Sequence, residues 1–178
     1  ATIVRYATGA DDTTTARVNG WRNRLAAHGY YYGGPVGVLV EYVRNQQGAT
    51  VMGTSTQLTN QAFQIAASVA VTPGDRPTYK SVKPKQAFDP SAGTWGAVEL
   101  AARYAELRID PEAFEQGFAN PSNSVERARA ITFGANWYFN EYLKLQVDYE
   151  GTVFRGGAAA DADRATEHVI ATRLQASI

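Results

Sequence analysis

The 178-residue sequence contains no cysteine, which excludes disulfide bonds, thiolate metal sites and thiol nucleophiles. Basic and acidic side chains are equal, at 17 each, so no excess of charge favours binding to nucleic acid. No run of about 18 or more apolar residues is present to form a transmembrane helix. No signal peptide opens the chain either, so we expect one to be already removed or to lie upstream of this start. A membrane-spanning form is then left only as a β-barrel, whose strands are half apolar.

What the sequence has in abundance is alternation. The stretch LKLQVDYEGTV, residues 143–153, places apolar side chains and glycine at odd positions and polar ones at even positions. Because successive side chains of an extended chain point to opposite faces, this pattern predicts a strand with an apolar face and an ionic face. The same period of two recurs in AITFGANWYFN, EHVIATRLQASI, WGAVELAARYAEL and NQAFQIAASVAV, and more loosely in PVGVLVEYVRN, RNRLAAHGYYY and an opening segment at 2–7. We predict an all-β, antiparallel fold with about eight strands.

The predicted connections alternate in length. Tight turns are expected at 33–35 and 140–141, and longer polar loops at 8–20, 46–57, 108–126 and 155–164. Outer-membrane barrels have short periplasmic turns and long external loops in this way. Residues 73–93 are an exception on the short side: either they fold into the lumen, or they cover the barrel mouth, or the alternation of loop lengths is a coincidence. Asp110 and Pro111 have the residue types of a helix start and predict one short external helix.

Aromatic residues gather beside the two tight turns. A girdle of such rings at the headgroup level is typical of membrane barrels, although strand ends of any β-protein also favour aromatics. The predicted girdle consists of Tyr30, Tyr31, Tyr32, Trp137, Tyr138, Phe139 and Tyr142.

Several of these segments also carry a family resemblance. The strings GANWYFNEYLKLQVDYEGTVFRGGA and DRATEHVIATRLQ, with GYYYGGPVGVLVEYVRNQQ, LTNQAFQIAASVAVTPGD and GTWGAVELAARYAELRID, resemble the C-terminal half of bacterial phosphate-selective porins of the O and P type. The resemblance implies a bacterial outer-membrane barrel of roughly sixteen strands, a homotrimer that passes phosphate or other anions. Two departures are the terminal Ile178, where an aromatic is usual, and the presence of about half the strands. We therefore expect residues 1–178 to be a single domain, the C-terminal portion of a larger transmembrane β-barrel whose N-terminal portion is missing. A closed small barrel is the second possibility.

If the apolar sets face lipid, the ionic sets face the lumen and tune selectivity. Arginine suits phosphate because its planar fork donates two hydrogen bonds while staying charged. The candidates for anion contact are Arg24, Arg103, Lys144 and Arg173, and the other residues expected in the lumen are Glu41, Glu99, Asp148, Glu150 and Glu167. The competing interpretation pairs Arg103 with Glu99 and Arg173 with Glu167 as ion pairs that stabilise the wall.

The sequence offers no pattern typical of an enzyme, a cofactor site or a metal site. The two histidines, His28 and His168, lie on different predicted strands, and DADR at 161–164 lacks the glycine and glutamate of a calcium loop. We expect a porin for anions such as phosphate, with outer-membrane lipid, small anions, further copies of the chain and its own missing half as partners. The alternatives are a structural outer-membrane barrel that anchors a surface-layer or envelope-spanning protein, and a soluble β-barrel or sandwich that binds a ligand.

Overall fold

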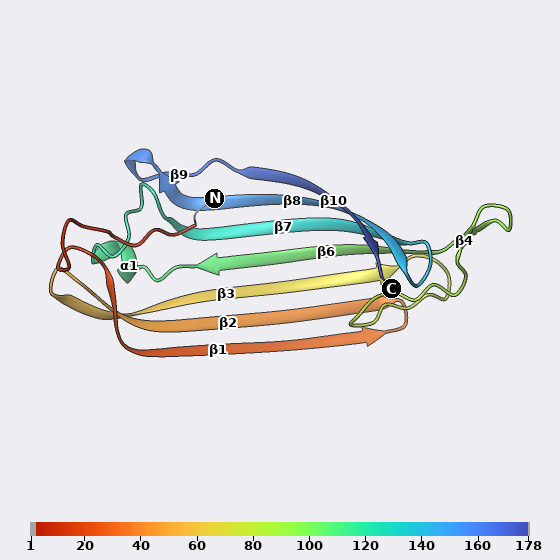
Figure 1. Cartoon of the computed structure of the whole chain (residues 1–178), viewed down its shortest axis with the longest axis horizontal. Coiled ribbons are helices and arrows are strands. Elements are labelled where there is room, and N and C mark those ends of the chain that lie inside the picture. The colour runs from red at the N-terminus through yellow and green to blue at the C-terminus, as the bar shows by residue number, and fades with distance from the viewer. Residues whose placement is uncertain (1–2, 178) are drawn as a thin grey trace.

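The computed structural model describes residues 3–177 and consists mainly of one antiparallel sheet. Its long strands are β1 (Arg17–Gly33), β2 (Val36–Val51), β3 (Thr54–Ala70), β6 (Ala97–Arg108), β7 (Val125–Tyr138), β8 (Leu143–Ala158) and β10 (Glu167–Ala176). They pair in the order of the sequence, and Figure 1 shows them side by side with the connections gathered at the two ends. Within the described residues β1 and β10 are the outer strands and do not pair with each other, so the sheet is open.

The remaining elements are short. They are β4 (Phe88–Asp89), β5 (Thr94–Trp95), α1 (Glu112–Glu115), the 3-10 turn η1 (Ala159–Asp161) and β9 (Ala162–Asp163). β4 pairs with β5, and β9 pairs with the end of β8. The predicted all-β antiparallel class is confirmed.

The predicted opening strand at 2–7 is wrong in the part that the structure describes, and Thr2, like Ile178, lies outside the described residues. Residues 3–7 form one isolated bridge, between Tyr6 and Ala119. Their backbone hydrogen bonds do not form a strand ladder: Ala7 donates to the Phe118 carbonyl in a loop at 2.7 Å, and the Ile3 carbonyl accepts from Val125, the first residue of β7, at 2.8 Å.

Two predicted loops, 46–57 and 155–164, are largely strand, so short and long connections do not alternate as predicted. β2 and β3 continue to a two-residue turn at Met52 and Gly53, whose φ angles of 47° and 78° suit a type I′ hairpin. Glutamine, serine and threonine on both faces gave the segment a loop-like composition, yet its backbone completes the ladder from Gln46↔Thr59 onward. β8 likewise runs on to Ala158.

The two faces of the sheet differ in chemistry, and the register shows which residues share a face, because direct cross-strand partners project to the same side. One row consists of Val38, Ala67, Ala102, Phe133, Tyr149 and Ile170, and we name its side the apolar face. The adjacent row consists of Leu39, Ala66, Arg103, Thr132, Glu150 and Val169, and we name its side the polar face.

One end of the sheet, which we name the α1 end, holds the β2–β3 turn and the connection from β6 to β7. A small core lies there on the polar face and includes Val51, Leu58, Ala113 and Phe118, with Val4 of the N-terminal segment packed against it. The predicted short helix is confirmed as α1, and its first free N–H, that of Glu112, donates to the Asp110 carboxylate at 3.0 Å. The core thus attaches α1 and residues 3–16 to the sheet.

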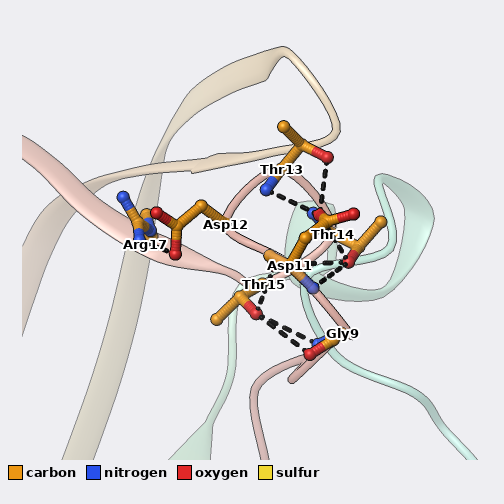
Figure 2. A network of polar contacts seen from close by, with 7 residues as sticks. All are labelled: Gly9, Asp11, Asp12, Thr13, Thr14, Thr15 and Arg17. Atoms are coloured by element: carbon orange, nitrogen blue, oxygen red, sulfur yellow. Dashed lines mark hydrogen bonds and ion pairs between the residues drawn. The ribbon is translucent and has the colours of Figure 1, made fainter.

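The N-terminal segment is held in shape by one carboxylate. Figure 2 shows Asp11 Oδ1 accepting the backbone N–H and the hydroxyl of both Thr13 and Thr14, at 2.7–3.0 Å. These bonds, first of all that from the Thr13 hydroxyl, lower the pKa of the Asp11 carboxyl to about 2 because they stabilise its charged form. The Met52 N–H then donates to the Thr13 carbonyl at 2.7 Å, which joins this segment to the β2–β3 turn.

The opposite end, which we name the β4 end, holds the β1–β2 and β7–β8 turns and the long connection 71–96. Val82 of this connection is 2% exposed and packs with Ala97 and Tyr138, and the Tyr79 ring contacts the Tyr30 ring in a tilted arrangement with 4.9 Å between centroids. Tyr30 and Tyr138 belong to the polar face by register, so the connection covers that face at this end. This agrees with the expectation that residues 73–93 fold inward or cover a mouth.

Candidate lumen surface

The nine residues that the sequence assigned to a lumen all lie on the polar face. Glu41 partners Gln64, Gln64 partners Ala105, and Arg103 lies two residues from Ala105 on the same strand. Cross-strand partners place the other residues in the same way. Arg24 is opposite Asn45 of β2, Glu150 is opposite Thr132 of β7, and Arg173 is opposite Gln146 of β8. The full set is Arg24, Glu41, Glu99, Arg103, Lys144, Asp148, Glu150, Glu167 and Arg173. One surface therefore collects these side chains from β1, β2, β6, β8 and β10.

A polar network crosses the middle of this surface over three strands. The Arg103 guanidinium donates to Glu150 at 2.7 Å, and the Thr132 hydroxyl between them donates to the same carboxylate at 2.8 Å. The predicted pairing of Arg103 with Glu99 is wrong. Residues i and i+4 of a strand share a face but stand about 13 Å apart, whereas Glu150 is two strands away in direct register.

The other four carboxylates of the set also accept hydrogen bonds. Gln64 donates to Glu41 at 2.6 Å and Gln146 donates to Asp148 at 2.7 Å. The Tyr138 hydroxyl donates to Glu99 at 3.0 Å. Glu167 forms an ion pair with Arg164, which makes its predicted pairing with Arg173 wrong.

The basic residues of the set make fewer hydrogen bonds and ion pairs than the carboxylates do. Lys144 lies over the Tyr138 ring, 5.5 Å from its centroid. Arg24 and Arg173 lie on the two outer strands, and among the described residues neither makes a hydrogen bond or an ion pair. Arg22 joins them on the polar face, where it donates to Asn45 at 3.4 Å. The sequence analysis missed Arg22, although its spacing of two from Arg24 is a signal that the two share a face.

Between these charges the polar face is built from small residues. A hollow of about 400 Å³ near the central network is lined in part by Ala66, Ala101, Gly134 and Ala171. Because alanine has a short side chain and glycine has none, the charged side chains extend beyond them into open space. The surface can therefore hold water and small ions along its length.

The predicted aromatic girdle needs correction at three positions. Tyr30, Tyr32 and Tyr138 project from the polar face, and Tyr138 is buried under the 71–96 connection, so none of the three can belong to an outer girdle. Tyr31 and Trp137 project from the apolar face, at the β4 end.

Phe139 and Tyr142 lie in the β7–β8 turn at the same end. Trp137 packs with Phe139 at 4.4 Å and with Phe88 at 5.3 Å between centroids. Its indole N–H donates to the Trp95 carbonyl at 2.7 Å. The sequence analysis did not include Phe88 and Trp95 in the girdle. They belong to the long connection, where no alternation of apolar and polar residues indicates which way a side chain points.

Other kinds of site find little support in the part of the chain that the structure describes. No helix there is long and apolar enough to cross a membrane. No group of three or more histidine and acidic side chains there is arranged to hold a metal ion. His168 makes a hydrogen bond with the Tyr149 hydroxyl at 2.7 Å on the apolar face.

Comparison with models of protein families identifies the family that this chain matches. The model of the family described as phosphate-selective porin O and P matches residues 4–178. No curated protein matches the chain.

Proposed function

The chain belongs to the family of phosphate-selective porins O and P, and from this premise we propose that its sheet is part of the wall of an outer-membrane pore for small anions such as phosphate. In this proposal the polar face lines the water-filled lumen and the apolar face meets lipid. Transport is passive, because the surface offers charges and hydrogen-bond donors along a path instead of one enclosed site.

The observation that supports this most strongly is the exposure of large apolar side chains on one whole face. Phe133 is 58% exposed, Ile131 50% and Ile170 76%, and they belong to a continuous apolar surface. Soluble monomers rarely expose apolar patches of this extent, whereas lipid-facing strands require them. A soluble carrier would instead bury this face in its interior.

A preference for anions is supported by how the two signs of charge are engaged on the polar face. Each of the five carboxylates in the set accepts at least one hydrogen bond from a neighbouring side chain. Arg24 and Arg173 keep their donors available to a solute, within the described residues. Because the numbers of basic and acidic side chains are nearly equal, the preference of this part of the wall is modest.

The proposal also requires additional strands. Lipid leaves each unpaired backbone group of β1 and β10 unsatisfied at a cost of several kcal/mol, so both edges must pair with further strands. About sixteen strands leave an aqueous channel, whereas eight leave an interior that side chains fill. We propose that a larger barrel of this kind assembles as a homotrimer, as the resemblance implies.

Ion selectivity in a planar bilayer tests the proposal. The intact polypeptide is expected to form channels whose reversal potential in a salt gradient shows anion preference. The double change Arg24→Glu and Arg173→Glu should lower the anion-to-cation permeability ratio by about two-fold or more, because the lumen gains negative charge. A matched control is Arg44→Glu on the apolar face of β2, which should leave the ratio unchanged. Absence of channels, or an equal effect of the control, would refute the assignment of the faces.

A further inference from the structure

We propose that a row of arginines on the apolar face binds the headgroup of an anionic lipid that carries phosphate monoesters. The inference rests on the proposed function, since it takes the apolar face to meet lipid. The row runs straight across five neighbouring strands in direct register and consists of Arg44, Gln61, Arg108, Arg127 and Arg155. With strands about 4.8 Å apart, it is roughly 20 Å long.

The row lies at the boundary of the apolar surface. The next row toward the middle contains Phe63, Glu106 and Arg129, and the one after it contains Val40, Ile65 and Ile131. Along β7, ten residues separate Arg127 from Trp137 at the β4 end, which is roughly 33 Å of strand and about 25 Å of height at the usual tilt. That height matches the apolar band of outer-membrane barrels. An arginine facing lipid is strongly destabilising at the bilayer midplane and costs little near the interface, so this position is at the headgroup level.

The charge of the row is not balanced by the protein. Arginines in direct register repel one another, and one carboxylate, Glu106, serves two of them together with Arg129 of the next row. Glu106 forms ion pairs with Arg108, with Arg129 at 3.2 Å and with Arg127 at 3.7 Å. Its side chain is only 9% exposed, so these arginines surround it on the side open to solvent.

The outer members of the row differ in how they are engaged. Arg155 forms an ion pair with Glu126 at 3.1 Å. Arg44 is exposed and has no acidic partner among the described residues. The four arginines of the row and Arg129 of the next row stand against two carboxylates, Glu106 and Glu126, which leaves three positive charges in excess.

Among the described residues near the row, further acidic side chains lie only on its α1 side, away from the apolar band. Asp110 and Glu115 line a groove between α1 and the row, and Asp110 is already bonded to the N–H of Thr59 at 2.6 Å. On the opposite side is a hollow of about 300 Å³ lined by Tyr42, Phe63, Glu106 and Arg108. A ligand that approaches from this side brings an anionic head to the arginines and an apolar tail to the band below.

This geometry selects the class of lipid. A phosphodiester with one charge reaches one or two arginines of a row roughly 20 Å long. A glycolipid with two phosphate monoesters carries more charge and can contact arginines on separate strands. A second copy of this chain that placed its own row against this one is disfavoured as the occupant, because like charges would meet.

Lipid binding to the intact, detergent-purified polypeptide tests the proposal, with bis-phosphorylated lipid A as the probe and native mass spectrometry as the readout. Lipid A should bind more tightly than phosphatidylglycerol, and phosphatidylcholine should bind least. The double change Arg44→Gln and Arg155→Gln should weaken lipid A binding about ten-fold, through the loss of charge-assisted hydrogen bonds. A matched control is Arg24→Gln with Arg173→Gln on the polar face, which should bind lipid A as the unchanged protein does.

Several outcomes would overturn the proposal. They are equal binding of lipid A by the row variant, equal binding of all three lipids, and complete displacement of lipid A by excess inorganic phosphate, which would indicate a site for free anions. A changed oligomer without a change in lipid binding would indicate a contact between copies. Conductance of the same variants separates this proposal from the pore, because the row variant should keep its selectivity and the control pair should lose it.

Discussion

The two faces of this sheet use the same residue type in opposite ways. On the polar face, arginines are distributed along the strands and alternate with carboxylates, as in the network of Arg103 with Glu150. On the apolar face they are confined to the α1 end, where four of them stand in one cross-strand row. The difference shows that position along a strand matters as much as face: a charge is tolerated anywhere along a water-filled wall but only at the rim of a lipid-facing one.

The largest expected effect comes from moving a charge to the wrong face at mid-height. Ala101 and Ala102 are consecutive on β6 and point to the polar and the apolar face, respectively. Ala102→Lys should lower the free energy of unfolding in lipid vesicles by about 2–4 kcal/mol, whereas Ala101→Lys should cost less than about 1 kcal/mol. Denaturant titration of both variants measures the contrast, and equal costs would remove the distinction between the faces.

A smaller effect is expected where the 71–96 connection covers the polar face. Val82 is almost fully buried there, so Val82→Ala should weaken the attachment of this connection by about 1–2 kcal/mol. Trypsin should then cut faster at Lys80 and Lys85, and single-channel conductance should rise as the covering segment detaches. Val71→Ala, at an exposed position of the same connection, serves as the control. Unchanged cleavage would indicate that Val82 does not hold the segment in place.

The ion pair on the polar face is expected to contribute less. Arg103 and Glu150 are 43% and 31% exposed, which places them among the pairs that water screens. A double-mutant cycle with Arg103→Gln and Glu150→Gln should give a coupling energy of about 0.2–1 kcal/mol. A coupling of several kcal/mol would mean that this face is dry, against the proposed lumen.

The smallest expected effect is the response of the N-terminal segment to low pH. Because its hydrogen bonds lower the pKa of Asp11 to about 2, their stabilisation is fully present above the ordinary value of 3.8. It is lost as the pH falls from that value through about 2, so the N-terminal segment should keep its order at pH 3. Amide chemical shifts of Thr13 and Thr14 between pH 5 and pH 1.5 should report a midpoint near 2. In Asp11→Asn this transition should be absent, and a midpoint near 3.8 in the unchanged protein would contradict the bonding in Figure 2.

The sequence predicted the face on which a strand residue lies better than it predicted where the strands end. Alternation placed Leu145 and Lys144 on opposite faces without any tertiary information, because the period of a strand is a local property. It failed at 46–57, where both faces of the hairpin are polar and the composition is that of a loop.

The arginine row shows the same limit. Each of its arginines continues the apolar set of its own strand by one or a few positions, as Arg44 follows Tyr42 and Arg155 follows Val153. The individual positions could therefore be read from the sequence. Their alignment could not, because it depends on the registers of four separate strand pairs.

The ion-pair partners on the polar face could also not be predicted from the sequence. Arg103 was expected to pair along its own strand and instead pairs with Glu150 across β7. The fold of residues 73–93 was open for a related reason, since Val82 is held by contacts with Ala97 and Tyr138 that no local pattern encodes.

The central claim, that the apolar face meets lipid and the polar face meets water, is tested most directly by cysteine accessibility in the membrane. The printed chain has no cysteine, so single substitutions at the neighbouring residues Thr132 and Phe133 report opposite faces without background. With the intact polypeptide in native outer membranes, a small water-soluble maleimide should label Thr132→Cys readily and leave Phe133→Cys protected. Rapid labelling of Phe133→Cys with protection of Thr132→Cys would contradict the account, because it would place water on the apolar face.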